Sequence, residues 1–189
     1  MLPVLSTCET LKKVLFMSHG AATADRIRGL YTPDQRARRD ATVWTTVQGV
    51  LAPLQFVVFL VSLVLVLRYL ASGFGYEVAT WSIVIKTGVL YLIMITGAIW
   101  EKIVFGQYLF APAFFWEDVF SFAVIALHTA YLWALWTAAL DPLNLMLLAL
   151  AAYAAYVINA VQFVLKLRAA RLQSEGEAKP APSGSEAAA

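Results

Sequence analysis

Residues 47–67 read VQGVLAPLQFVVFLVSLVLVL and carry no charged side chain. A run of about 20 apolar residues is long enough for a helix to cross the hydrocarbon core of a bilayer. Three similar runs follow, at 81–100, 119–140 and 143–165. None of the four shows the alternation of an outer-membrane strand. The sequence therefore predicts an all-α polytopic membrane protein, a bundle of four transmembrane helices.

The composition excludes an ordinary soluble domain. Of the 189 residues, 61% are hydrophobic and 14% are charged, and the mean hydropathy is +0.72. Soluble domains are about 45–50% apolar and about 25% charged. The net charge of +2 is too small to indicate a nucleic-acid partner. A single cysteine, Cys8, allows no intrachain disulfide, and the two histidines, His19 and His128, argue against a metal centre built by the protein alone.

The segments around the four runs divide the chain into three parts. Residues 1–30 lack the uninterrupted apolar stretch of a cleaved signal, and we expect a loosely ordered extension. Residues 31–171 form the four-helix domain, and the Thr-Pro-Asp-Gln sequence at 32–35 predicts a capped helix before the first run. Residues 172–189 are small, polar and proline-containing, and we expect a disordered tail.

Basic residues in the short flanks predict the orientation of the helices, because cytoplasmic flanks are enriched in Lys and Arg. The connection after the first run holds a single basic residue, Arg68, and the connection after the third run holds none. Both termini are therefore expected in the cytoplasm, together with the connection between the second and third runs. The flanking basic residues are Lys12, Lys13, Arg26, Arg28, Arg36, Arg38 and Arg39 before the first run, and Lys166, Arg168, Arg171 and Lys179 at the end of the fourth and beyond it.

The connection between the second and third runs has an unusual composition. Residues 100–118 read WEKIVFGQYLFAPAFFWED, and seven of the nineteen are aromatic. We expect an aromatic loop in the membrane interface, where Trp and Tyr are favoured. A tryptophan precedes acidic residues at each end: Trp100 before Glu101, and Trp116 before Glu117 and Asp118. These acids are either ordinary helix-end charges or functional carboxylates, since an acid beside an apolar wall is costly.

Helical spacing places further polar side chains on the inner faces of the predicted helices, because lipid cannot satisfy them. Under the predicted topology most of them gather toward the cytoplasmic end, beside aromatic walls. For the Gln and Asn side chains, a network of interhelical hydrogen bonds is the alternative explanation. Lys86 is expected to extend to water. The polar positions are Gln48, Gln55, Lys86, Glu101, Glu117, Ser121, His128, Asn159, Gln162 and Lys166.

Two stretches carry a resemblance to a known family. LYTPDQRARRDATVWTTVQGVLAPLQFVVFLVSLVLVLRYL at 30–70 and KTGVLYLIMITGAIWEKIVFGQYLFAPAFFWEDVFSFAVIALHTAYLWAL at 86–135 resemble the 3-vinyl (in older numbering 2-vinyl) bacteriochlorophyllide hydratases. The resemblance runs from about Leu30 to about Arg171, and residues 100–118 are its most specific part.

The resemblance implies a hydro-lyase of bacteriochlorophyll a biosynthesis. Such an enzyme adds water to the C3 vinyl group of chlorophyllide a or 3-vinyl bacteriochlorophyllide a and forms the 3-(1-hydroxyethyl) product. No cofactor is required, because hydration changes no net oxidation state. The implied partners are the magnesium chlorin or bacteriochlorin substrate, membrane lipid and neighbouring enzymes of the same synthesis. The implied location is a bacterial cytoplasmic or intracytoplasmic membrane.

Hydration of a vinyl group needs a proton donor for the terminal carbon and a base for the attacking water. We hypothesise that Glu101, together with Glu117 or Asp118, supplies this acid/base pair. His128 is either a packed histidine or a ligand to the substrate's magnesium, and Lys102 or Lys166 is a candidate partner for the substrate carboxylate. The other expected substrate contacts are Trp100, Trp116, Gln48, Gln55, Asn159 and Gln162.

Two other functions fit the same sequence. A non-catalytic pigment-binding or assembly protein would use the aromatic walls and His128 without an acid pair. A small proton-coupled carrier would use Lys86 and Glu101 as a relay, but four spans without a visible repeat are few for a carrier.

Overall fold

The computed structural model describes residues 30–177, with side chains through Leu172, and within this range it is entirely helical apart from short connections. A short helix α2 (Pro33–Ala41) precedes four long ones: α3 (Val43–Ser72), α4 (Tyr76–Phe105), α5 (Phe115–Trp136) and α6 (Pro142–Glu177). By length and composition each long helix is able to cross a membrane, α6 over Pro142–Leu172. The predicted all-α architecture with four spans is confirmed.

The two predicted terminal segments, 1–30 and 172–189, lie only partly within the described residues. The predicted tail begins at residue 172, whereas α6 continues to Glu177. Residues 178–189, and almost all of the extension predicted at 1–30, lie outside the described residues.

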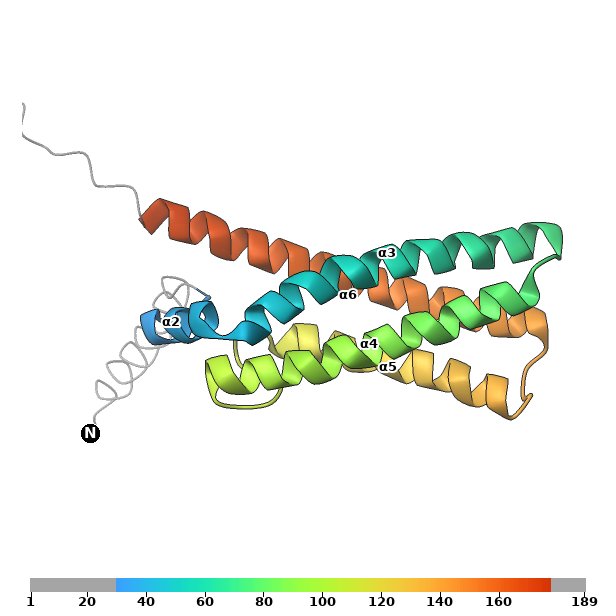
Figure 1. Ribbon diagram of the computed structural model, residues 1–189, viewed down its shortest axis with the longest axis horizontal. Helices are drawn as coiled ribbons and strands as arrows, with labels where there is room; N and C mark the ends of the chain where they lie inside the picture. Colours follow the sequence, from blue (N-terminus) through green and yellow to red (C-terminus); the bar gives the residue numbers. More distant parts are fainter. Residues whose placement is uncertain (1–29, 178–189) are drawn as a thin grey trace, which may run out of the picture.

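The four long helices run along one axis as an elongated bundle (Figure 1). The most extensive contacts are between α3 and α4 and between α5 and α6, while contacts of α3 with α6 and of α4 with α5 close the bundle. One end holds α2, the start of α3, the loop between α4 and α5, and the C-terminal part of α6. We call this the loop end. The α3–α4 and α5–α6 turns lie at the opposite end.

Local sequence signals explain where several helices begin and end. The Thr32 hydroxyl accepts from the Gln35 N–H at 3.3 Å, and the Gln35 side chain accepts from the Thr32 N–H at 2.9 Å. This is the predicted capping box of α2. Gly73 and Gly106 end α3 and α4 with φ of +74° and +88°, a left-handed conformation that favours glycine.

The start of α6 is capped by Asp141, which lies in the turn after α5. One of its carboxylate oxygens accepts from the backbone N–H of Leu143 at 3.2 Å and of Asn144 at 3.4 Å. The side-chain hydrogen bond from Asn144 is the main reason why the pKa of Asp141 lies below its usual value. A capping carboxylate at a helix N-terminus also interacts favourably with the helix dipole.

The interior of the bundle combines aromatic packing with hydrogen-bonded polar groups. The Phe59 ring meets the Tyr153 ring edge-on at 5.4 Å, and the Tyr153 hydroxyl lies 2.5 Å from the Ser62 hydroxyl, which also contacts Ser82 at 2.7 Å. Many large apolar side chains are exposed on the outside. This is the arrangement that a surrounding lipid phase requires. The buried polar residues are Gln55, Ser62, Lys86, Thr87, Thr96, Glu101, Glu117, Asp118, Ser121, His128 and Asn159.

The left-handed glycine that ends α4 gives a stability prediction. Gly106→Ala forces a Cβ into the φ of +88° and should cost about 1 kcal/mol of unfolding free energy. Gly88→Ala is the matched control, because Gly88 lies inside α4 with no atom within 4 Å of an added Cβ. Alanine is favoured over glycine within a helix, so Gly88→Ala should leave the stability equal or higher. Unfolding of the two purified variants in the same detergent measures both free energies. An equal loss of stability in Gly106→Ala and Gly88→Ala would contradict the left-handed requirement at Gly106.

Candidate active site

Three acidic side chains from two helices meet at the loop end. Glu101 comes from the last turns of α4, and Glu117 and Asp118 come from the first turn of α5. Their exposed fractions are only 5%, 7% and 3%. The side chains of Glu101 and Asp118 are within hydrogen-bonding contact of each other. The structure therefore brings together all three acids that the sequence suggested.

The backbone of the α4–α5 loop binds two of these acids directly. The Phe110 N–H donates to Asp118 Oδ2 at 2.6 Å, and the next N–H, from the buried Ala111, donates to Glu101 Oε2 at 3.4 Å. Phe110 has a φ of +58°, which is uncommon for a residue with a side chain. This strain is offset by the short hydrogen bond that the turn makes with a carboxyl group.

The third acid has a different partner. Lys166 Nζ, from α6, lies 2.5 Å from Glu117 Oε2, and this ammonium group is also 5.1 Å from the centre of the Phe114 ring. The Lys166 side chain is partly exposed, while Glu117 is buried. Glu117 therefore has a compensating cation, whereas Glu101 and Asp118 lie against each other and against backbone amides.

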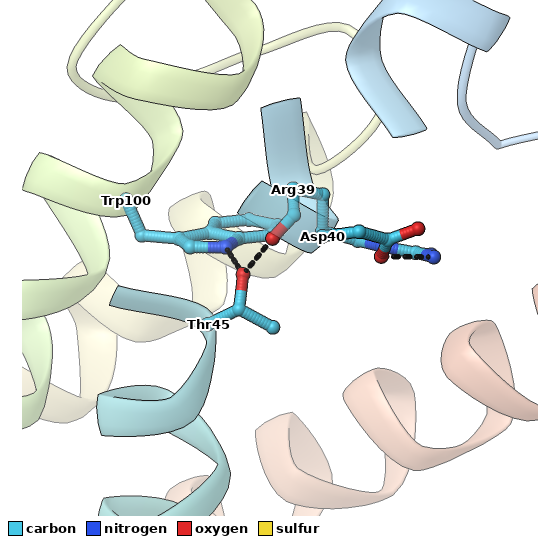
Figure 2. A network of polar contacts seen from close by, with 4 residues as sticks. All are labelled: Arg39, Asp40, Thr45 and Trp100. Carbon is cyan, nitrogen blue, oxygen red and sulfur yellow. Dashed lines mark hydrogen bonds and ion pairs between the residues drawn. The ribbon is translucent and has the colours of Figure 1, made fainter. Parts of the chain in front are cut away.

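The two tryptophans that precede the acids lie in different environments. Trp100 Nε1 donates to the Thr45 hydroxyl at 2.9 Å, and this hydroxyl donates to the Arg39 carbonyl at 2.6 Å (Figure 2). The indole of Trp100 also packs edge-on against Phe105 and Phe114. Trp100 thus ties α4 to the α2–α3 junction, whereas Trp116 is largely exposed.

The sequence predicted aromatic walls beside the acids, but it did not single out the three exposed rings that lie there. Phe110 stacks on Phe122 with centroids 5.4 Å apart and planes 9° apart, and it contacts Phe115 at 5.7 Å. Between 39% and 44% of each of these residues is exposed. We call these three rings the ring patch. The helical spacing of Phe115 and Phe122 around Asp118 could have predicted that these two rings lie beside the acid. The position of Phe110 could not be predicted, because it depends on a left-handed turn that has no sequence pattern.

Some of the residues predicted to contact the substrate form hydrogen bonds within the protein instead. The Lys102 ammonium donates to the Gly106 carbonyl at 2.8 Å and so caps α4, although the side chain is exposed. The Gln48 amide donates to the Thr96 hydroxyl at 2.8 Å and joins α3 to α4. Gln55 is buried, and neither polar atom of its amide has a hydrogen-bond partner within the described part of the chain.

Two further amides lie on α6. Asn159 Nδ2 donates to the Ser121 hydroxyl at 2.8 Å, a contact between α6 and α5. The oxygen atoms of the Asn159 and Gln162 amides are buried and have no hydrogen-bond partner in residues 30–172.

Lys86 and His128 form a separate polar contact deeper in the bundle. Lys86 is fully buried, so the expectation that it extends to water is wrong. Its ammonium group lies 2.6 Å from His128 Nε2 and 4.3 Å from the centre of the Tyr156 ring. His128 Nδ1 donates to the Val124 carbonyl at 2.8 Å. A magnesium-ligand role for His128 would require Lys86 to release Nε2.

The fold and this site define a class of protein: a helical membrane protein that holds a buried carboxyl cluster at one end of its bundle, beside exposed aromatic rings. The model of one family, 2-vinyl bacteriochlorophyllide hydratase, matches residues 31–169. The chain belongs to this family, and the resemblance seen in its sequence is confirmed.

Similar proteins cover most of the chain. A 2-vinyl bacteriochlorophyllide hydratase of Rhodobacter capsulatus is 71% identical over 150 residues, which is 79% of this chain and 87% of that protein. A protein of the same name from Cereibacter sphaeroides is 73% identical over 149 residues, which is 78% of this chain and 92% of that protein. Among solved structures, none matches the chain.

The buried Lys86–His128 contact gives a prediction about stability. Lys86→Met leaves the buried His128 Nε2 without a donor, but a neutral acceptor costs less to leave unpaired than the Lys86 amine does, so this variant should lose only about 1 kcal/mol. His128→Leu should lose roughly 2 kcal/mol, because it leaves the Lys86 amine without its imidazole acceptor. Thermal unfolding in detergent measures both variants. A Lys86→Met variant that is less stable than His128→Leu would contradict this account.

Proposed function

We propose that this chain is a hydratase that adds water to the C3 vinyl group of a chlorophyllide or bacteriochlorophyllide. The product would carry a 1-hydroxyethyl group and serve bacteriochlorophyll synthesis. Family membership and two relatives of that name at 71% and 73% identity support this proposal. The observation that carries the mechanism is the buried contact between Glu101 and Asp118.

The acid pair would supply the proton. Two buried carboxyl groups in contact share a proton rather than carry two charges. Glu101 and Asp118 would deliver this proton to the terminal vinyl carbon, where a new C–H bond forms as the double bond breaks. The inner carbon is left with a positive charge, which is delocalised into the macrocycle. Glu117, which is paired with Lys166, would line the same site as a third carboxyl group.

Water would then complete the reaction. Its oxygen forms a bond to the inner carbon, and its surplus proton passes to a carboxylate of the cluster. The acid pair regains the proton that it gave up, so the net change is the addition of one water without any oxidant or reductant. The role of the protein is to hold a proton donor and a proton acceptor in a site from which bulk water is excluded.

The ring patch would hold the macrocycle. A flat, largely apolar ring system packs favourably on aromatic rings. Phe115 precedes Asp118 by three residues and Phe122 follows it by four, so the two rings and the acid lie on neighbouring faces of α5. A macrocycle on the ring patch would bring one edge to the acids. Lys102, exposed at the end of α4, is the lysine best placed to turn toward the substrate carboxylate.

We also propose that the loop end faces the cytoplasm. It carries Arg36, Arg38 and Arg39 on α2 and Lys166, Arg168 and Arg171 on α6, and cytoplasmic flanks are rich in such residues. Both termini would then be cytoplasmic, in a bacterial cytoplasmic or intracytoplasmic membrane. The pigment would reach the acids from the inner leaflet.

Conversion of a vinyl pigment by the purified full chain tests the proposed activity. The protein in lipid nanodiscs, incubated with chlorophyllide a and no added cofactor, should yield a more polar product with the mass of one added water and a blue-shifted absorption band. Pigment that binds and is recovered unchanged would favour the alternative of a non-catalytic pigment-binding protein.

Removal of either shared carboxyl should abolish catalysis. Glu101→Gln and Asp118→Asn should each lower kcat by at least about 100-fold, because the amide cannot carry the transferred proton. Pigment binding should be retained. Glu77→Gln, an exposed acid in the first turn of α4, is the control and should be unaffected. Rates near the wild-type value in both cluster variants would contradict the acid-pair mechanism.

The ring patch gives a prediction about pigment binding. Phe122→Ala should raise KM for the pigment about tenfold, because one aromatic contact is worth about 1 kcal/mol beyond the apolar area it buries. Its kcat should change little, since the acids stay in place. Phe56→Ala on α3, also exposed, is the matched control. An unchanged KM for Phe122→Ala, or the same rise in Phe56→Ala, would contradict the assignment.

A further inference from the structure

We infer that the side-chain amides of Asn159 and Gln162 hold the water that adds to the vinyl group, and thereby select the face of the substrate that this water attacks. The inference rests on the proposed hydration. It assigns a water-binding role to two residues of α6 whose buried amide oxygens have no hydrogen-bond partner among the described residues.

The contacts between α5 and α6 place these amides beside the acids. Asn159 bonds Ser121, and Lys166 bonds Glu117. Gln162 lies three residues after Asn159 and four before Lys166, so all three share one face of α6. The Gln162 amide therefore lies between the two interhelical contacts, at the level of the carboxyl cluster.

Both amides have an unused acceptor. Asn159 is more than nine-tenths buried, and its Oδ1 has no hydrogen-bond donor among the described residues. Turning this amide over would only exchange the atom that lacks a partner, because Ser121 offers a single hydroxyl. Gln162 Oε1 is buried and unpartnered in the same part of the chain. Buried amide oxygens are almost always hydrogen-bonded, and ordered water is the usual partner when no protein group serves.

A water at this position would be oriented for attack. It would donate one hydrogen to an amide oxygen and the other to a carboxylate of the cluster. Its lone pairs would then point toward the substrate carbon. As the new C–O bond forms, the carboxylate receives the proton that its hydrogen bond already shares, so the proton balance of the proposed reaction is kept.

The geometry of α5 separates this water from the macrocycle. At about 100° per residue, Ser121 and Glu117 face α6, while Phe115 and Phe122 lie about 100–160° further round the helix. Asp118 lies between the two sets. The substrate cation is planar at its inner carbon, and water held on the α6 side reaches only one of its faces. The product should therefore be predominantly one epimer of the 1-hydroxyethyl group.

The epimer ratio of the product distinguishes water positioning from a structural role. Asn159→Leu has a similar size and removes both polar atoms of the amide. Ser121→Ala removes the same α5–α6 hydrogen bond but leaves the Asn159 amide in place, so it is the matched control. Each full-length variant in nanodiscs converts chlorophyllide a, and chromatography resolves the two epimers.

We expect wild-type and Ser121→Ala protein to give the same dominant epimer. Asn159→Leu should form both epimers, with kcat lowered about tenfold. If Asn159→Leu does not fold, Gln162→Leu, at a less buried position, should show the same loss of selectivity. The inference is overturned by an equal epimer mixture from the wild type, by an unchanged ratio in the folded α6 variant, or by the same shift in Ser121→Ala. A wild type that forms no hydroxyethyl product would instead contradict the proposed function itself.

Discussion

A polar group buried inside a bundle of apolar helices has to find its partner within the protein, and the contact between Glu101 and Asp118 depends on this constraint. Neither acid has solvent to stabilise its charge. Each instead accepts a hydrogen bond from the α4–α5 loop, through the successive N–H groups of Phe110 and Ala111. The same few bonds therefore fix the end of α4, the start of α5 and the path of the loop between them. In the proposed mechanism, the proton-transfer site and the junction of α4 with α5 are therefore one structure.

Much of the fold could be predicted because membrane helices follow simple rules. The four apolar runs became four long helices, and the residues at 32–35 formed the expected capping box. The gathering of Glu101, Glu117 and Asp118 also followed from sequence, because adjacent antiparallel helices must bring the residues beside their connection to one end. These features depend only on the length of the apolar runs, the spacing of residues along a helix and the closeness of residues in the sequence.

Other parts of the site depend on how each helix is rotated, and this is not visible in a single sequence. Trp100 and Trp116 both precede acids, yet one is hydrogen-bonded inside the bundle and the other is exposed. Lys86 faces His128 rather than the surface. The ring patch depends on the left-handed turn at Phe110, and the hydrophobic pattern carries no signal for such a turn.

The α4–α5 loop has a consequence for how this chain can change in length. Its two consecutive amides reach two different carboxyl groups, so adding or deleting a single residue near position 110 would pull at least one amide away from its acid. The turn at residues 73–75 makes no such connection to the acids, and insertions there would leave the chemistry alone. Under the proposed mechanism, the number of residues in this loop is thus as important for catalysis as the identity of the acids that it binds.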